Sequence, residues 1–289
     1  MSSDIEVLSI IAGEGDLPLE IAKACEEANI PICIIGLKGY AEADRFSAYN
    51  TTMIGLGELG KASKAMKRAG TSHVVMAGGI DRPDMRNLKL DFEAMRMMPK
   101  LLKAAGKGDS ALLDFVRDFV TSKGWQIISP AKLMGSLNVS AGEAGACEPD
   151  EQDWIDIKKG VAIARDLGKH DVAQGAVLAN GFVLALEAAE GTDQMLRRVA
   201  DLPAGLRGTE DDRAGVLVKV TKPIQDRNLD LPTIGPRTVE LAAAAGLKGI
   251  AVEAEGSLIV DREATIAKAD ELGLFIEGVD IKELTQEGA

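Results

Sequence analysis

The sequence has very little histidine and lacks the motifs of several common hydrolytic mechanisms. His73 and His170 are the only 2 histidines in 289 residues, and no HExxH motif or other metal-ligand spacing accompanies them. This argues against a histidine-rich dimetal hydrolase. The chain also has no G-x-S-x-G elbow and no P-loop, so neither acyl transfer by a serine nor ordinary NTPase chemistry is supported.

Cysteine and aromatic residues are scarce as well, and the chain has no excess of positive charge. The 3 cysteines, Cys25, Cys33 and Cys147, have no CxxC spacing, which predicts reduced and mostly buried thiols. Aromatic residues make up only 3%, so the core must consist of small and branched aliphatic side chains, as suits an α/β chain. The formal net charge of −12 argues against binding nucleic acid, which needs clustered Lys and Arg.

A targeting segment is not visible at the N-terminus. The stretch MSSDIEVLSIIAGEG has no basic region, and its apolar run is too short for a signal peptide or a transmembrane helix. We therefore expect a cytoplasmic protein.

The first half of the chain alternates between strand-like and helical patterns. Apolar, β-branched runs bounded by turn residues are separated by segments with helical spacing. Such alternation predicts a parallel sheet with crossover helices, that is, a Rossmann-like N-terminal domain over residues 1–137. The predicted strands are 5–13, 31–37, 51–55, 72–79 and 125–129, and the predicted helices are 19–28, 58–70, 91–105 and 109–123.

The second half has a different pattern and predicts a mixed α+β domain over residues 150–289. A turn-rich stretch without apolar periodicity, 136–150, separates it from the first half. Asn180-Gly181 lies between two apolar runs, which predicts a β-hairpin. Strands are predicted at 215–220 and twice within 249–261, and helices at 150–168, 236–246 and 262–272. The whole chain is therefore of the α/β class.

Two glycine-bearing loops are predicted at the same edge of the first sheet. GEGDLP follows the first strand and offers Gly13, Gly15 and Leu17 for contact with a nucleotide or phosphate. Its G-x-G-x-x-P pattern lacks the third glycine of the dinucleotide fingerprint, and the second strand lacks the acid that binds a ribose. AGGIDRPD follows the fourth strand, and for its Gly79, Ile80 and Asp81 we favour a binding role over a structural turn.

Charged residues cluster in the second half. Thr192 and Asp193 precede a predicted helix, where they either cap it or meet a phosphate or a metal. Lys219 and Lys222 lie at the end of a strand, where ammonium groups can neutralise phosphate oxygens.

Asp230 stands before Leu231, Pro232 and Thr233, and the proline stiffens the chain beside it. Such a carboxylate either binds Mg²⁺ or aims a water, or it only caps a turn. Carboxylates, a hard cation and lysine together suit phosphoryl transfer.

Several stretches together resemble a known family. They are IIAGEGDLPLEIAKA, VVMAGGIDRPD, ALEAAEGTDQMLRR, VLVKVTKPIQDRNLDLPTIGPRTVE and GIAVEAEGSLIVDREATIAKADELGLFIEGV. Across nearly the whole chain they resemble the LpxI-type UDP-2,3-diacylglucosamine pyrophosphatases, and KPxQD-x₃-DLPTIG is the most specific block.

The resemblance implies an enzyme of lipid A biosynthesis in Gram-negative bacteria. It would cleave the diphosphate of UDP-2,3-diacylglucosamine to UMP and 2,3-diacylglucosamine 1-phosphate, also called lipid X, with water attacking the phosphorus nearer the sugar. It implies a homodimer, Mg²⁺ as cofactor, substrate enclosed between the domains, and transient contact with the inner membrane. Asp230 would be the catalytic carboxylate and a metal ligand, and Asp193 would assist the metal.

One departure from the family concerns the first loop. It reads GEGDLP where an uninterrupted glycine run is expected, and Glu14 adds a negative charge. This favours contact with the uridine or its ribose over direct phosphate contact at that turn. The methionine-rich stretch 95–102 either covers acyl chains or is plain core.

Two hypotheses of other classes remain. A non-catalytic nucleotide-sugar or lipid carrier would bind the same ligand without turnover. A nicotinamide-dependent oxidoreductase would bind NAD, although the missing ribose acid counts against it.

Overall fold

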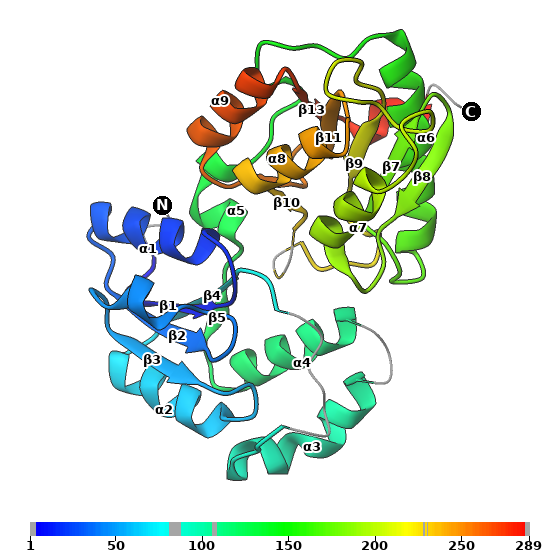
Figure 1. Ribbon diagram of the computed structural model, residues 1–289. Coiled ribbons are helices and arrows are strands. Elements are labelled where there is room, and N and C mark those ends of the chain that lie inside the picture. The colour runs from blue at the N-terminus through cyan, green and yellow to red at the C-terminus, as the bar shows by residue number, and fades with distance from the viewer. Residues whose placement is uncertain (1–3, 81–87, 106–108, 228, 230, 287–289) are drawn as a thin grey trace. The chain divides into compact units, whose positions relative to one another are not determined.

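The computed structural model describes residues 4–80, 88–105, 109–227, 229 and 231–286 (Figure 1). It divides into two compact units, Met1–Ser136 and Leu137–Arg227 with Leu231–Ala289. Each unit has its own sheet and its own buried core. This confirms the predicted α/β class.

The first unit is built on a five-stranded sheet in which every neighbouring pair is parallel. Its strands are β1 (Leu8–Ala12), β2 (Ile32–Leu37), β3 (Thr51–Ile54), β4 (His73–Ala77) and β5 (Gln126–Ile127). The spatial order is β3-β2-β1-β4-β5, the order of the first strands in doubly wound nucleotide-binding folds. The predicted parallel sheet is confirmed, and its order reverses between β1 and β4.

Helices cover both faces of this sheet (Figure 1). The helices are α1 (Leu17–Glu27), α2 (Leu59–Ala69), α3 (Phe92–Ala105), α4 (Asp109–Ser122) and α5 (Pro130–Leu133), with short 3₁₀ turns at Ala43–Phe46 and Gly135–Leu137. Residues three or four apart, such as Ala62 and Met66 of α2, face the core with Phe119 of α4, Cys33 and Ile35. Gly70 ends α2 in the left-handed conformation, which glycine adopts without strain.

Helix α3 carries the methionine-rich stretch. Met95 is exposed, and so is Phe92 at the start of the helix, whereas Met97 packs against the core of the unit. The stretch therefore divides between surface and core.

The second unit has a mixed six-stranded sheet and a separate two-stranded parallel sheet. The strands are β6 (Gly142–Glu143), β7 (Gly175–Ala179), β8 (Phe182–Leu186), β9 (Val216–Lys219), β10 (Thr233–Ile234), β11 (Gly249–Glu253), β12 (Leu258–Ile259) and β13 (Phe275–Val279). The larger sheet has the order β6-β13-β11-β9-β7-β8. Strands β9, β11 and β13 are parallel, whereas β7, β8 and β6 are each antiparallel to a neighbour.

The helices of the second unit lie on opposite faces of the larger sheet (Figure 1). They are α6 (Glu151–Gly168), α7 (Gly191–Ala200), α8 (Pro236–Ala244), α9 (Arg262–Leu272) and the short α10 (Ile281–Gln286). Val216 and Val218 of β9 pack with α6, while Leu217 between them packs with α7 and α8. This alternation follows from the two-residue period of a strand.

The hairpin at Asn180-Gly181 is confirmed. It joins the antiparallel strands β7 and β8, and both turn residues have positive φ, 52° and 82°. Two such residues in a two-residue loop favour Asn-Gly because larger side chains are strained there. The Gly181 N–H donates to Asp156 of α6 at 2.7 Å, which ties the turn to that helix.

Two parts of the second sheet were not predicted from the sequence. Strand β13 is fully buried next to β11, but its short run FIEGV follows directly on a helical pattern. The stretch 138–149, left between the predicted domains, belongs to the second unit: Val139 is buried in its core and β6 pairs with β13.

The cysteines behave as the composition indicated. All 3 are free; Cys25 and Cys33 are buried, and Cys147 is partly buried. Burial raises the pKa of the Cys25 thiol to about 11, so it stays protonated and unreactive at neutral pH. Among the described helices, none has the length and apolar character to cross a membrane.

Candidate functional site

The two glycine-bearing loops of the first unit hydrogen-bond to each other. Gly13 N–H donates to the Ala77 carbonyl at 2.8 Å, Glu14 N–H to Gly79 at 2.8 Å, and Gly79 N–H to Glu14 at 3.1 Å. A Cβ on Gly13 would lie 2.3 Å from the Gly79 oxygen, and one on Gly78 would lie 2.4 Å from the Glu14 oxygen. The glycines therefore allow the two backbones to pack closely. The N–H groups of Gly13, Glu14 and Gly79 already donate hydrogen bonds between the loops, so they are not free to bind a phosphate.

The residues predicted to bind at these loops differ in exposure. Gly13 and Leu17 are buried, whereas Gly15 and Gly79 are exposed and the Ile80 side chain is half exposed. Gly15 has a φ of 91° and its carbonyl accepts from Arg45, which also pairs with Asp16 at 2.6 Å. Asp81 lies outside the described residues. The exposed part of this turn thus carries the charge of Glu14 and an ion pair.

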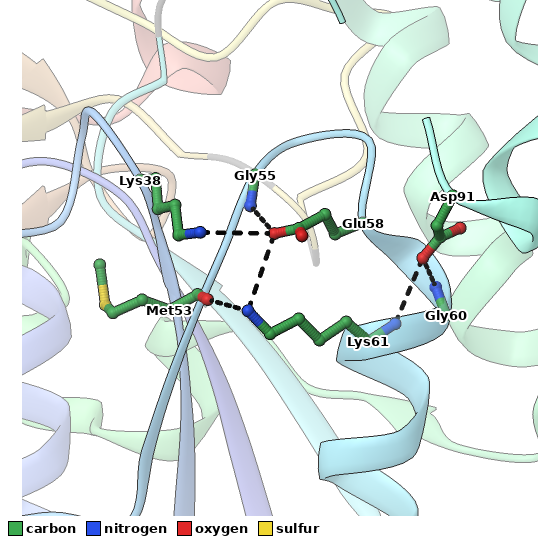
Figure 2. A network of polar contacts seen from close by, with 7 residues as sticks. All are labelled: Lys38, Met53, Gly55, Glu58, Gly60, Lys61 and Asp91. Atoms are coloured by element: carbon green, nitrogen blue, oxygen red, sulfur yellow. Dashed lines mark hydrogen bonds and ion pairs between the residues drawn. The ribbon is translucent and has the colours of Figure 1, made fainter. Parts of the chain in front are cut away.

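Charges at the ends of β2 and β3 neutralise each other (Figure 2). The Glu58 carboxylate accepts from Gly55 N–H at 2.7 Å and lies 3.7 Å from the Lys38 ammonium and 3.9 Å from that of Lys61. The Gly55 hydrogen bond, more than the two lysines, lowers the pKa of Glu58. Asp91 accepts from Gly60 N–H at 2.6 Å and joins the start of α2 to that of α3.

The second unit brings a different set of side chains to one sheet edge. Strands β9 and β11 end there with Lys219 and Glu253, and antiparallel β7 begins there with Gly175. Gly175 pairs with Lys219, and its carbonyl accepts from Glu187 N–H at 3.0 Å, just beyond β8. Glu187, Gly175 and Lys219 therefore form a row across three neighbouring strands.

Lys219 is the buried cation of this edge. Its residue is only 5% exposed, and the ammonium donates to the Thr233 carbonyl at 3.1 Å. No carboxylate in the described part of the chain lies within ion-pair distance of it. A buried ammonium held by one neutral acceptor is prepared to attract an anion.

Thr192 and Asp193 lie in the first turn of α7, beside this row. The N-cap position of α7 is occupied by Glu190, so the N-cap interpretation of Thr192 and Asp193 is wrong. The Glu190 side chain itself makes no capping hydrogen bond. The Thr192 hydroxyl donates to Glu187 Oε1 at 2.7 Å instead. Asp193 is paired with Arg237 of α8 at 2.7 Å.

Lys222 does not join Lys219. Its ammonium pairs with Asp171 at 2.8 Å, and both side chains are largely buried, 13% and 11% exposed. A Cβ on Gly168, at the end of α6, would lie 3.2 Å from the Lys222 backbone. The two lysines predicted to act together thus serve opposite sides of the sheet, since Lys219 lies on the side of α7 and α8.

The segment 221–235 is held at its start by the edge of the larger sheet and near its end by strand β12. Thr221 N–H donates to Glu253 at 2.8 Å, and Arg227 also pairs with the Glu253 carboxylate. Leu231 and Pro232 are buried, and the Pro232 carbonyl accepts from Leu258 N–H at 2.9 Å. Asp230, the predicted catalytic residue, lies outside the described residues.

Glu187 was not selected from the sequence. It ends the apolar run FVLALE, where a charged residue directly after a strand is a weak signal because such residues are usually solvated. Only the pairing of β7, β8 and β9 shows that it is buried beside Lys219. Among the described residues, no group of three or more His, Cys, Asp or Glu side chains is arranged so that it could hold a metal ion.

Comparison with solved structures gives only distant similarity. CobK precorrin-6A reductase has 12% identity and a TM-score of 0.33, over 95% of this chain and 87% of that one. UDP-glucose 4-epimerase of Thermus thermophilus in complex with NAD has 14% identity and a TM-score of 0.31, over 98% and 93%. Scores this low support no conclusion.

Comparison with sequences is decisive. The family model of the LpxI N-terminal domain matches residues 7–137, and that of the LpxI C-terminal domain matches residues 140–277. UDP-2,3-diacylglucosamine pyrophosphatase LpxI of Caulobacter vibrioides is 45% identical over 276 residues, which are 96% of this chain and 98% of the relative. One family thus accounts for both units, and the chain belongs to the LpxI family.

Proposed function

We propose that this chain hydrolyses the diphosphate of UDP-2,3-diacylglucosamine, giving UMP and 2,3-diacylglucosamine 1-phosphate in the lipid A biosynthesis of a Gram-negative bacterium. The observation that carries the proposal is the 45% identity to the Caulobacter enzyme over 96% of the chain. The edge of the second sheet supports it because a buried lysine and a buried carboxylate lie there in one row, with Gly175 between them. These groups suit phosphoryl transfer, in which positioning and charge neutralisation provide most of the rate enhancement.

Lys219 would bind an oxygen of the diphosphate. Its ammonium is held by the Thr233 carbonyl and has two further N–H donors. Burial strengthens its attraction for a phosphate oxygen because little water screens the charge. Lys219 would thus withdraw charge from the phosphate as the bond to the leaving group breaks.

We further propose that the reaction requires Mg²⁺, held by Asp230 and Asp193. The residues at the sheet edge fit a hard cation: all the candidate donors are oxygens, and one buried carboxylate oxygen of Glu187 lacks a hydrogen-bond partner in the described part of the chain. When bound, Mg²⁺ would offset negative charge on the diphosphate. Asp193 would exchange its contact with Arg237 for this role.

Asp230 is the proposed catalytic carboxylate. It would hold the metal or orient the attacking water toward the phosphorus nearer the sugar, and Leu231, Pro232 and Thr233 would fix the chain beside it. Gly15, Gly79, Ile80 and Asp81 of the first unit are proposed to contact the nucleotide.

The test is release of UMP from UDP-2,3-diacylglucosamine by the purified protein with Mg²⁺. Asp230→Ala should lower turnover by about 1,000-fold or more, because it removes a carboxylate that acts in the transition state. Near-normal turnover by this variant would reject Asp230. Substrate binding by the wild-type protein without any UMP release would instead support the competing hypothesis of a carrier.

We also propose that the protein works in the cytoplasm as a homodimer and meets its lipid substrate at the inner-membrane surface without inserting. The net charge of −12 is unfavourable for tight binding to anionic lipid, so contact would be transient. Light scattering would give the oligomeric state. Sedimentation with anionic vesicles would measure the membrane contact.

A further inference from the structure

Glu187 has an unusual environment for a carboxylate. The residue is 6% exposed and lies directly after β8. Oε1 accepts the Thr192 hydroxyl at 2.7 Å, whereas Oε2 is buried and has no hydrogen-bond partner among the described residues. Buried carboxylate oxygens are usually paired because removing the charge from water is unfavourable.

The free oxygen lies on the same face of the sheet as the Lys219 side chain. A Cβ on Gly175 would be only 2.7 Å from Glu187 Oε2, so this oxygen lies where the side chain of residue 175 would begin. Gly175 is directly opposite Lys219, and side chains of paired residues leave the sheet on the same face. The missing side chain at Gly175 therefore provides the space in which Glu187 Oε2 faces the region around Lys219.

The neighbouring cations are engaged elsewhere. Lys219 donates to Thr233, Arg237 pairs with Asp193, and Arg198 pairs with Glu190 and the Leu186 carbonyl. Lys219 supplies positive charge on this face, but no ion pair joins it to Glu187 in the described part of the chain. Glu187 Oε2 is therefore a buried carboxylate oxygen with no donor or cation paired to it in the described part of the chain, and a hard divalent cation would satisfy an oxygen of this kind.

We propose that Glu187 is a ligand of the divalent cation, binding it through Oε2 while Thr192 holds Oε1 in place. This rests on the proposed function, because the metal is the one that the diphosphate hydrolysis requires. Mg²⁺ takes oxygen ligands, which come from carboxylates, waters and substrate phosphate groups. Glu187 supplies such a carboxylate, and Lys219 lies on the same face to bind the same diphosphate.

The experiment measures metal binding without substrate turnover. Mn²⁺ is titrated into the full-length protein, alone and with UMP, and free Mn²⁺ is followed by electron paramagnetic resonance. Glu187→Gln preserves the shape of the side chain and removes its charge. It should weaken Mn²⁺ binding by about tenfold or more, as expected for loss of a metal-binding group. Glu190→Gln changes an exposed glutamate in the same turn and should leave the affinity within about twofold of wild type.

Thermal unfolding separates this role from a structural one. Without metal, Glu187→Gln should be at least as stable as wild type, because it removes a buried charge that lacks a cation. With Mn²⁺ the wild-type melting temperature should rise, and the rise should be smaller in Glu187→Gln. Glu187→Asp, which keeps the charge, should recover part of it.

Equal Mn²⁺ affinity in wild type and Glu187→Gln would overturn the proposal. So would a wild-type protein that binds no Mn²⁺ both with and without UMP. A wild-type protein that binds Mn²⁺ through Glu187 but releases no UMP would overturn the proposed function instead.

Discussion

The two sheets end in contrasting edges. In the first unit, the loops after β1 and β4 share backbone hydrogen bonds, and Glu58 forms ion pairs with Lys38 and Lys61 (Figure 2). In the second unit, a buried ammonium and a buried carboxylate share a face without an ion pair between them in the described part of the chain. The first edge is satisfied by its own groups, whereas the second retains unmatched charge.

The contrast shows that the same kind of residue after a strand can be there for different physical reasons. Glycines after a parallel strand suggest a phosphate-binding loop, but Gly13 and Gly78 are explained by the contact between the loops themselves. Charged residues after a strand suggest a solvated surface, but Lys219 and Glu187 are buried. Close packing of the two loops therefore explains Gly13 and Gly78. Chemistry is expected at the second edge, where the charges of Lys219 and Glu187 are buried without an ion pair between them in the described part of the chain.

The largest effect should come from breaking the glycine contact of the first edge. Gly13→Ala would place a Cβ 2.3 Å from the Gly79 oxygen, so the two loops must separate. We expect a loss of about 3 kcal/mol in the free energy of unfolding, as for a severely overpacked site. Gly79→Ala is the matched control: its Cβ would have no atom within 4 Å, and the change should stay within about 0.5 kcal/mol.

Urea denaturation of both variants checks this prediction. A stability loss of the same size in Gly79→Ala would show that loop flexibility, and not the close approach, explains the glycines.

The next effect compares one lysine from each edge. Lys219→Met keeps the apolar stem and removes the buried charge, so kcat/KM for UMP release should fall about 100-fold, as when one transition-state donor is lost. Lys38→Met removes an exposed lysine whose charge is already balanced by Glu58, and kcat/KM should change less than about threefold. Equal losses in the two variants would contradict the assignment of the chemistry to the second edge.

The smallest effect concerns an exposed ion pair away from both edges. Asp150 caps α6 by accepting from Asp153 N–H at 2.9 Å, and a hydrogen bond from Lys248 is the main cause that lowers its pKa to about 2. A lowered folded-state pKa stabilises above the unfolded value of 3.8, and this stability is lost as the pH falls through about 2. Because the side chain is 54% exposed, solvent screening should limit the gain to less than about 1 kcal/mol.

Asp150→Asn, which can still cap the helix, checks this sign. Its stability deficit relative to wild type should shrink between pH 5 and about pH 3. A deficit that is constant across this range would show that the charge contributes nothing.

Much of the fold could be predicted from local pattern. The parallel strands of the first unit, the helix at Glu151–Gly168 and the Asn180-Gly181 hairpin all have clear periodicity or turn residues. The family could be recognised from the block that contains Asp230, although the structure does not describe that residue. Strand β13 was missed because five residues carry too little periodicity to be distinguished from the end of a helical segment.

The candidate site could be predicted only in part. The predicted roles of Lys219, Thr192 and Asp193 stay predictions, and the structure places Lys219 at the edge of the second sheet and the other two in the first turn of α7. Lys222 was expected to act with Lys219 but pairs with Asp171. The reason is geometric, because the chain turns after β9 and carries Lys222 to the side of α6. No sequence spacing reports such a turn.

Residue order was sufficient for the class of fold, the positions of most elements and the family, because these depend on short-range periodicity and on motifs contiguous in the chain. It was insufficient for which charges meet and which remain unmatched. Glu187 and Lys219 lie 32 positions apart, and they come into one row only because β7 pairs with β8 on one side and with β9 on the other. Burial, which makes their charges significant, arises only when those strands and the helices above them pack together.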